Sequence, residues 1–205
     1  MITEAAPDPE WLDVLREETR RVGALLIFDE IKTGFRVAAG GAAARFGGAP
    51  DLLVFGKALA NGFPLAAVGG RRAVMEDARR TWISSTLATE MVALAAAEAT
   101  LEVVVREQVP AHLDRVGTFL LDGFARLAAR YPGLLGAPIG VPEMCALRFS
   151  TDEAGSGLAR FAADHGLLFK RSAYNFVSLA HGPAEVEQAL AVLEEGCRAI
   201  EGGGA

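Results

Sequence analysis

The sequence predicts an α/β fold, because short apolar runs alternate with stretches of helical periodicity. Two such runs, 24–28 and 51–55, end in charge or glycine, as do strands of a parallel sheet that is buried on both faces. A charged amphipathic stretch over 9–23 and an alanine-rich stretch over 89–105 predict helices. Pro132-Gly133 is a strong stop signal, and a smaller α+β region is expected beyond it.

The remaining elements follow from the same patterns, taken in chain order. After the two strands we expect a short strand over 65–68, and the helix over 89–105 is expected to continue past Pro110 into 113–131. Beyond the stop we expect strands over 145–149 and 167–170 and helices over 157–165 and 183–200. We expect two regions, 1–109 and 110–205.

Asp29 and Lys57 each follow one of the two apolar runs. The carboxyl ends of parallel strands meet at the edge of an open α/β sheet where ligands bind. An acid and an amine at that edge suit pyridoxal 5′-phosphate, because the lysine can form a Schiff base with the aldehyde and later act as a general base. The carboxylate can keep the pyridine nitrogen protonated, so that the ring draws electrons.

Each of these residues also has an ordinary interpretation. Lys57 could be a surface lysine where the strand emerges, and Asp29 could be a helix cap or a loop carboxylate. A buried Asp29 would be costly unless a positive charge, such as a protonated pyridine, met it. Glu30 points the other way on an extended backbone, and we expect it to make a structural hydrogen bond or salt bridge.

Three segments carry a family resemblance: 26–36 (LIFDEIKTGFR), 51–57 (DLLVFGK) and 61–70 (NGFPLAAVGG). They resemble the class III pyridoxal-phosphate aminotransferases, and within these the glutamate-1-semialdehyde 2,1-aminomutase branch. The resemblance implies fold type I of the PLP-dependent transferases. Region 1–109 would then be the C-terminal part of the large cofactor-binding domain, and 110–205 a small C-terminal α+β domain.

The resemblance also implies roles for further residues. Ile31 stands where the family usually has valine or alanine, a small volume change, and is expected to pack against the cofactor ring; an ordinary core isoleucine is the alternative. Ser85 and Thr86 would contact the cofactor phosphate, with Thr86 reaching the neighbouring subunit's cofactor, so that a homodimer would complete the site. Plain N-capping is their alternative. Arg171 could clamp a substrate carboxylate, and a solvated charge pair is its alternative.

Composition excludes several other classes of protein. The net charge of −6 and the pI near 5.2 argue against a nucleic-acid partner, which needs a basic surface. The apolar stretches are too short for a membrane span, and the N-terminus lacks a signal layout, so we expect a cytoplasmic protein. Cys145 and Cys197 match no metal spacing and are expected to be reduced, structural thiols. No metal centre is expected.

Members of the resembling family are about twice as long as this chain, which matches their C-terminal half. The chain is therefore a fragment, the partner of a separately encoded N-terminal half, or a degenerate remnant. We expect amino-group transfer on a small amino or keto substrate through Lys57. The alternatives are a non-catalytic remnant or subunit-interaction module, and a cofactor-free Schiff base as in aldolases. The last would leave Asp29 without a role and would usually come with a barrel of repeated units.

Overall fold

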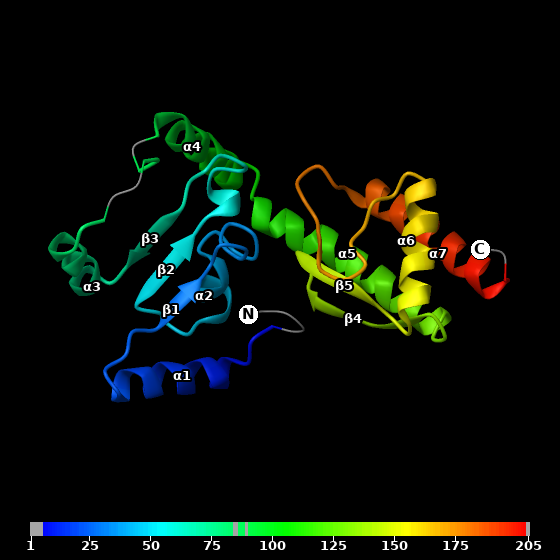
Figure 1. Ribbon diagram of the computed structural model, residues 1–205, viewed down its shortest axis with the longest axis horizontal. Helices are drawn as coiled ribbons and strands as arrows, with labels where there is room; N and C mark the ends of the chain where they lie inside the picture. The colour runs from blue at the N-terminus through cyan, green and yellow to red at the C-terminus, as the bar shows by residue number, and fades with distance from the viewer. Residues whose placement is uncertain (1–5, 84–85, 89, 204–205) are drawn as a thin grey trace. The chain divides into compact units, whose positions relative to one another are not determined.

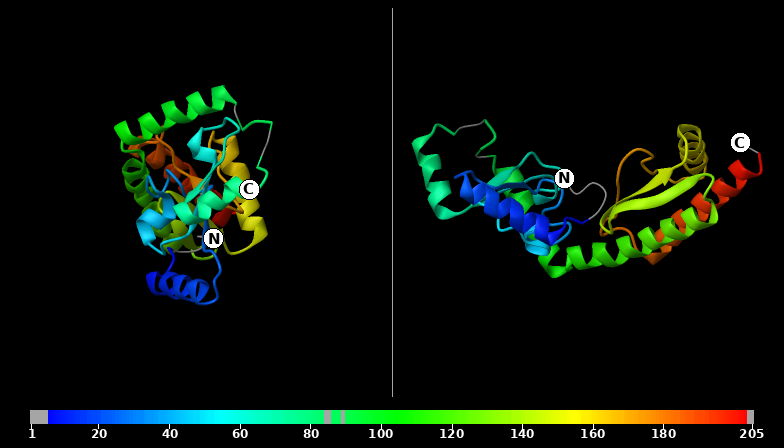
Figure 2. Two further views of the ribbon diagram at one scale, coloured as in Figure 1. Left: turned by 90° about the vertical axis from the view of Figure 1, so that its left-hand side faces the viewer. Right: turned by 90° about the horizontal axis from the view of Figure 1, so that it is seen from below.

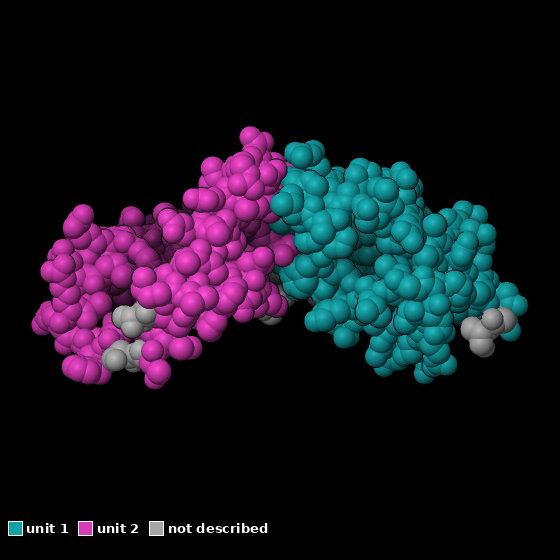
Figure 3. All heavy atoms as spheres, turned by 90° about the horizontal axis from the view of Figure 1, so that it is seen from above, with its two compact units in different colours: residues 1–6, 112–205 teal, residues 7–111 magenta. Residues whose placement is uncertain are grey.

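The computed structural model describes residues 6–83, 86–88 and 90–203. The chain divides into two compact units at residue 111, coloured separately in Figure 3. We call residues 7–111 the N-terminal unit and the residues from 112 onward the C-terminal unit, and describe each by itself. The division at residue 109 that the sequence suggests stays a prediction. Among the described residues, no helix combines the length and the apolar character needed to cross a bilayer.

The N-terminal unit alternates helices and short strands around one sheet (Figure 1). Asp8 caps the first helix, since its carboxylate accepts the N–H of Glu10 at 2.9 Å, and Pro9 fills the first helical position, where no N–H is needed. The elements, in chain order, are α1 (Pro9–Arg21), β1 (Ile27–Asp29), α2 (Gly41–Phe46), β2 (Leu52–Phe55), the 3-10 helix η1 (Lys57–Leu59), β3 (Ala67–Gly70), α3 (Arg72–Asp77), the 3-10 helix η2 (Ala78–Arg80) and α4 (Met91–Arg106).

The sheet of this unit has the order β1-β2-β3. β1 runs parallel to β2, in the register that places Ile27 beside Leu52 and Asp29 beside Val54. β3 runs antiparallel to β2 and places Val68 beside Val54. The α/β fold class and the parallel pairing of the first two strands are therefore confirmed.

The expectation that these strands are buried on both faces is wrong. Asp29, Val54 and Val68 stand in register, so their side chains share one face with Ile27. Ile27 and Val68 are each 54% exposed. We call the face that carries these four residues the open face. The apolar pattern of the strands is present, but no described residue covers this side as the pattern requires.

The C-terminal unit is built around a second sheet, with the order β4-β5-β6 and antiparallel pairing throughout. Figures 1 and 2 show the long helix α5 running beside this sheet. Phe124, Leu147, Leu158 and Leu193 are almost completely buried in its core. Its elements are α5 (Val109–Arg130), β4 (Leu135–Val141), β5 (Met144–Phe149), α6 (Asp152–Asp164), β6 (Asn175–Phe176) and α7 (Pro183–Glu201).

One expected strand of this unit is wrong, and two strands, β4 and β6, were not expected. Residues 167–170 form no strand, because Lys170 donates its N–H to the side chain of Asn175 at 2.7 Å rather than to a neighbouring strand. β4 contains two glycines and Pro138, residues that weaken a strand signal, and its register with β5 shifts between Gly136 and Ile139.

Both cysteines lie in the C-terminal unit, and both are free and buried. Burial raises the pKa of the Cys145 thiol to about 12 and that of Cys197 to about 11. Such thiols are protonated at neutral pH and unreactive, in agreement with the structural role expected of them.

Candidate active site

β1 and β2 lie side by side (Figure 1) and pair in parallel, with Asp29 and Lys57 at their carboxyl ends. Asp29 is the last residue of β1, and Lys57 opens η1, two residues after the end of β2. Both side chains are exposed. Since the strands are parallel and in register, the acid and the amine belong to the same edge of the sheet, the edge at which open α/β sheets bind ligands.

The backbone of Lys57 adopts an unusual conformation. Its φ of 42° lies in the left-handed region, which residues other than glycine rarely adopt and which concentrates at functional sites. Within the described part of the chain, its ammonium group has neither a hydrogen bond nor an ion pair. A cation held by a constrained backbone and left without a counter-ion is available to a ligand.

Asp29 is exposed, not buried. Its Oδ1 accepts the N–H of Ile31 at 3.0 Å, which turns the chain directly after β1. Ile31 is half-buried, and a methyl group placed on Gly56 would lie 3.6 Å from its side chain. Ile31 therefore packs beside the residue that precedes Lys57, between the two strand ends. Its predicted contact with a cofactor ring stays a prediction.

Glu30 makes the structural hydrogen bonds that the sequence predicted. The carboxylate is 1% exposed and accepts the hydroxyl of Thr33 and the N–H groups of Ala42 at 2.8 Å and Ala43 at 2.7 Å. The last two belong to the first turn of α2, where N–H groups have no partner within the helix. Glu30 thereby fixes the loop that follows Asp29.

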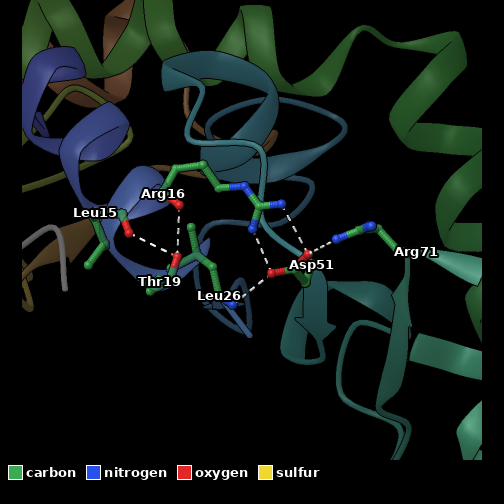
Figure 4. A network of polar contacts seen from close by, with 6 residues as sticks. All are labelled: Leu15, Arg16, Thr19, Leu26, Asp51 and Arg71. Atoms are coloured by element: carbon green, nitrogen blue, oxygen red, sulfur yellow. Dashed lines mark hydrogen bonds and ion pairs between the residues drawn. The ribbon is translucent and has the colours of Figure 1, made fainter. Parts of the chain in front are cut away.

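A second buried carboxylate, which the sequence analysis missed, lies at the opposite end of the strands (Figure 4). Asp51 is 2% exposed and accepts hydrogen bonds from Arg16, from Arg71 and from the N–H of Leu26. The Arg16 guanidinium, then the Leu26 amide and then Arg71 hold the pKa of Asp51 well below its usual range. The one local signal was an aspartate in front of an apolar run.

The remaining predicted residues lie elsewhere. Ser85 is outside the described residues, and Thr86 is exposed in a turn. Glu90 caps α4, by accepting the N–H groups of Val92 at 2.9 Å and Ala93 at 2.5 Å. The N-capping alternative therefore does not hold for Thr86, and its phosphate contact stays a prediction.

Arg171 lies in the C-terminal unit and forms an ion pair of 2.9 Å with Asp152, whose side chain is 93% exposed. This is the solvated charge pair given above as its alternative, and a role on substrate stays a prediction. Among the described residues, no group of three or more histidine, cysteine or acidic side chains is placed to hold a metal ion.

Comparisons with known sequences agree with this arrangement. The sequence pattern of the family Aminotransferase class-III matches residues 4–196. A glutamate-1-semialdehyde 2,1-aminomutase from Pyrobaculum aerophilum is 35% identical over 95% of this chain and 50% of its own length. One from Neisseria meningitidis is 37% identical over 95% of this chain and 49% of its own length. The chain thus spans about half the length of the curated relatives it matches.

Solved structures give the same result. The internal aldimine form, with pyridoxal 5′-phosphate, of the FumI protein from Sphingopyxis sp. MTA144 is similar with a TM-score of 0.88 and 26% identity, over 97% of this chain and 49% of that one. The lysine aminotransferase of M. tuberculosis, also in its internal aldimine form, has a TM-score of 0.81 and 26% identity, over 94% and 46%. The chain belongs to the class III aminotransferases, a pyridoxal-phosphate-dependent family of fold type I.

Proposed function

We propose that this chain carries the lysine and the aspartate of an enzyme that transfers amino groups with pyridoxal 5′-phosphate, and that it works as one part of a larger site. The observation that carries the proposal is the pair formed by Asp29 and Lys57 at the ends of adjacent parallel strands. Because the chain spans half of its relatives, the activity of the whole enzyme does not follow from family membership alone.

The residues present fit this cofactor. When bound, it supplies an aldehyde that captures amines and a protonated ring that withdraws electrons. Lys57 would hold it covalently through Nζ and, once freed, would move a proton at the substrate Cα. Asp29 would accept the hydrogen bond of the ring N–H and keep that proton in place. Ile31 packs beside Gly56, the residue before Lys57, and would offer an apolar contact for the ring.

The substrate class is a small amino or keto compound. An aminotransferase passes the amino group to a second substrate, and an aminomutase returns it to another carbon of the same one. Both reactions use the same acid and the same amine. The named relatives include aminomutases and a lysine aminotransferase, so both belong to the proposal.

The open face supports the need for a further polypeptide. Asp29 shares this face with exposed Ile27 and Val68, and water around a carboxylate weakens its hold on a cationic ring. We infer that the missing half of the family's length covers Asp29, whether on the same chain or encoded separately. We further infer a cytoplasmic homodimer in which Thr86 reaches the partner's cofactor. The open face also favours the second candidate, a non-catalytic subunit-interaction module.

Covalent trapping tests the proposal. The chain contains three lysines, Lys32, Lys57 and Lys170, so borohydride reduction with pyridoxal 5′-phosphate followed by peptide mapping assigns every adduct. We expect the adduct on Lys57, its loss in Lys57→Ala and its retention in the matched control Lys32→Ala. Asp29→Asn should weaken it, and an unchanged adduct in Asp29→Asn would contradict the proposed role of Asp29 on the ring.

The interaction-module candidate predicts a different result. The trapping is repeated with the half of the Neisseria meningitidis aminomutase that this chain does not match. Formation of a complex without an adduct on Lys57 would reject the enzymatic proposal and leave the module.

A further inference from the structure

The buried carboxylate of Asp51 joins several elements of the N-terminal unit through one hydrogen-bond network (Figure 4). Its Oδ2 accepts the Arg16 guanidinium at 2.6 Å and the Leu26 N–H at 2.9 Å. Its Oδ1 accepts the second Arg16 nitrogen at 3.1 Å and Arg71 at 2.6 Å. The carboxylate therefore ties α1, the residue before β1 and the residue after β3 to the start of β2.

The backbone of Asp51 strengthens the same junction. Its N–H donates to the carbonyl of Leu26 at 2.7 Å, and its carbonyl accepts the N–H of Arg71 at 2.9 Å. Leu26 is thus bound through its N–H by the Asp51 side chain and through its carbonyl by the Asp51 backbone. Two opposite bonds to one residue fix how far β1 can move along β2.

This fixation matters because β1 is short. Only Ile27, Phe28 and Asp29 are paired with β2. A register is strongly specified where one face of a strand is buried, and none of these three residues is fully buried. A slip of one residue would move Asp29 by about 3.3 Å relative to β2 and turn its side chain to the other face. Asp29 would then no longer face the cofactor that Lys57 is proposed to bind.

We propose that Asp51 is a positioning residue of the cofactor site, whose buried carboxylate sets the β1–β2 register and through it the place of Asp29 relative to Lys57. The inference rests on the proposed function for its cofactor part. The register itself is a property of the chain without any ligand, so the two parts are tested separately.

The first test uses native hydrogen exchange on the full chain without cofactor. Glu30 donates its N–H to the Val54 carbonyl at 2.8 Å and so reports on the end of the β1–β2 pairing. In Asp51→Asn we expect exchange at Glu30 to rise by about tenfold or more. The control is Val104→Ala, a buried change on α4, compared at equal global stability. Equal rates at Glu30 in the two variants would overturn the inference.

A second variant keeps the test decisive if Asp51→Asn does not fold. Arg16→Lys retains the charge but loses the planar fork that binds both oxygens of Asp51. We expect it to speed exchange at Glu30, by a smaller factor than Asp51→Asn would. Exchange at the wild-type rate in Arg16→Lys would contradict a register set by this pair.

The second test is a double-mutant cycle on the fraction of Lys57 trapped by borohydride. If Asp51 acts by placing Asp29, then Asp29→Asn combined with Asp51→Asn should lower the trapped fraction no further than the stronger single variant. If the double variant instead lowers the trapped fraction by the product of the two single-variant losses, Asp51 acts independently of Asp29. That result would show a merely structural role and overturn the inference. If wild-type Lys57 forms no adduct even with the complementary half, the proposed function fails, while hydrogen exchange still decides whether Asp51 sets the register.

Discussion

The two units of this chain differ in how many of their large apolar side chains are exposed. In the described part of the C-terminal unit, the exposed large apolar side chains are limited to Leu168, Phe176 and Leu179. The core of this unit is buried by its own residues. In the described part of the N-terminal unit the exposed large apolar side chains are Trp11, Val14, Val22, Leu25, Ile27, Phe63, Val68, Trp82, Ile83, Leu87, Met91, Val92, Leu94 and Val105.

The difference indicates which unit buries its own apolar side chains and which unit leaves many of them exposed. Scattered exposed apolar residues are ordinary, but a gathered set of them marks a surface that another element covers. The N-terminal unit carries both the open face and the pair formed by Asp29 and Lys57. The unit that carries the proposed cofactor residues is therefore also the one with the larger exposed apolar surface, in agreement with a chain that spans half of its relatives.

The largest expected effect is on stability. Leu193 is 1% exposed in the C-terminal unit, and Leu193→Ala should lower the free energy of unfolding of that unit by about 2–5 kcal/mol, because it removes buried methyl groups and leaves a cavity. Ile27→Ala in the N-terminal unit should cost less than about 0.5 kcal/mol, because its side chain is already exposed. Hydrogen exchange across a urea series measures the free energy of unfolding of each unit separately. Equal losses of stability in the two variants would contradict the difference between the units.

Thiol labelling sharpens the comparison at the C-terminal unit. Because burial raises the pKa of Cys145 to about 12 and of Cys197 to about 11, little thiolate is present near neutral pH. Labelling of the native chain at pH 8 should be slower than that of free cysteine by about a hundredfold or more. Urea should restore the ordinary rate. Rapid labelling without denaturant would show that this core is open.

Acid should act on the N-terminal unit through Asp51. The pKa of its carboxyl is lowered in the folded chain, so its stabilisation is present above the unfolded-state pKa of about 3.9 and is lost as the pH falls below that value. Fluorescence of Trp11 and Trp82, both in this unit, follows the loss. Asp51→Asn should lower stability at neutral pH and flatten the acid dependence; the same acid midpoint and slope in the variant would assign the loss to other groups.

The smallest expected effect concerns dye binding to the open face. The native chain should bind an apolar dye such as anilinonaphthalene sulfonate, and Ile27→Ser with Val68→Ser should reduce the fluorescence modestly, since other exposed apolar residues remain. The matched control is Leu168→Ser in the C-terminal unit. A larger loss in the control would place the dye-binding surface in the wrong unit.

Local patterns predicted much of the fold. The apolar periodicity predicted α1 and α7 within a few residues, and the runs that end at Asp29 and Phe55 predicted the parallel pair. β4 was missed because its glycines and Pro138 hide the strand signal. The strand expected over 167–170 failed because a side-chain bond to Asn175 satisfies the backbone there.

The site was predicted less evenly. The structure places Asp29 and Lys57 at the strand ends where the motif predicts them, and Glu30 makes the structural hydrogen bonds expected of it; the roles of Asp29 and Lys57 on a cofactor stay predictions. Asp51 was missed because its partners, Arg16 and Arg71, are 35 and 20 residues away, and only the folded sheet brings them together. The exposure of the open face could not be predicted either. An apolar strand pattern indicates that the side chains of the strand are buried, but it does not identify the polypeptide that covers them.

The central claim is that the N-terminal unit holds one part of a cofactor site that a cover completes. The most direct test is the fraction of Lys57 trapped by borohydride with pyridoxal 5′-phosphate, measured for the chain alone and with the complementary half of the Neisseria meningitidis relative. We predict a rise of about tenfold or more on adding that half, because a cover that excludes water strengthens the charged contact at Asp29. A trapped fraction spread evenly over Lys32, Lys57 and Lys170 in both preparations would contradict the claim.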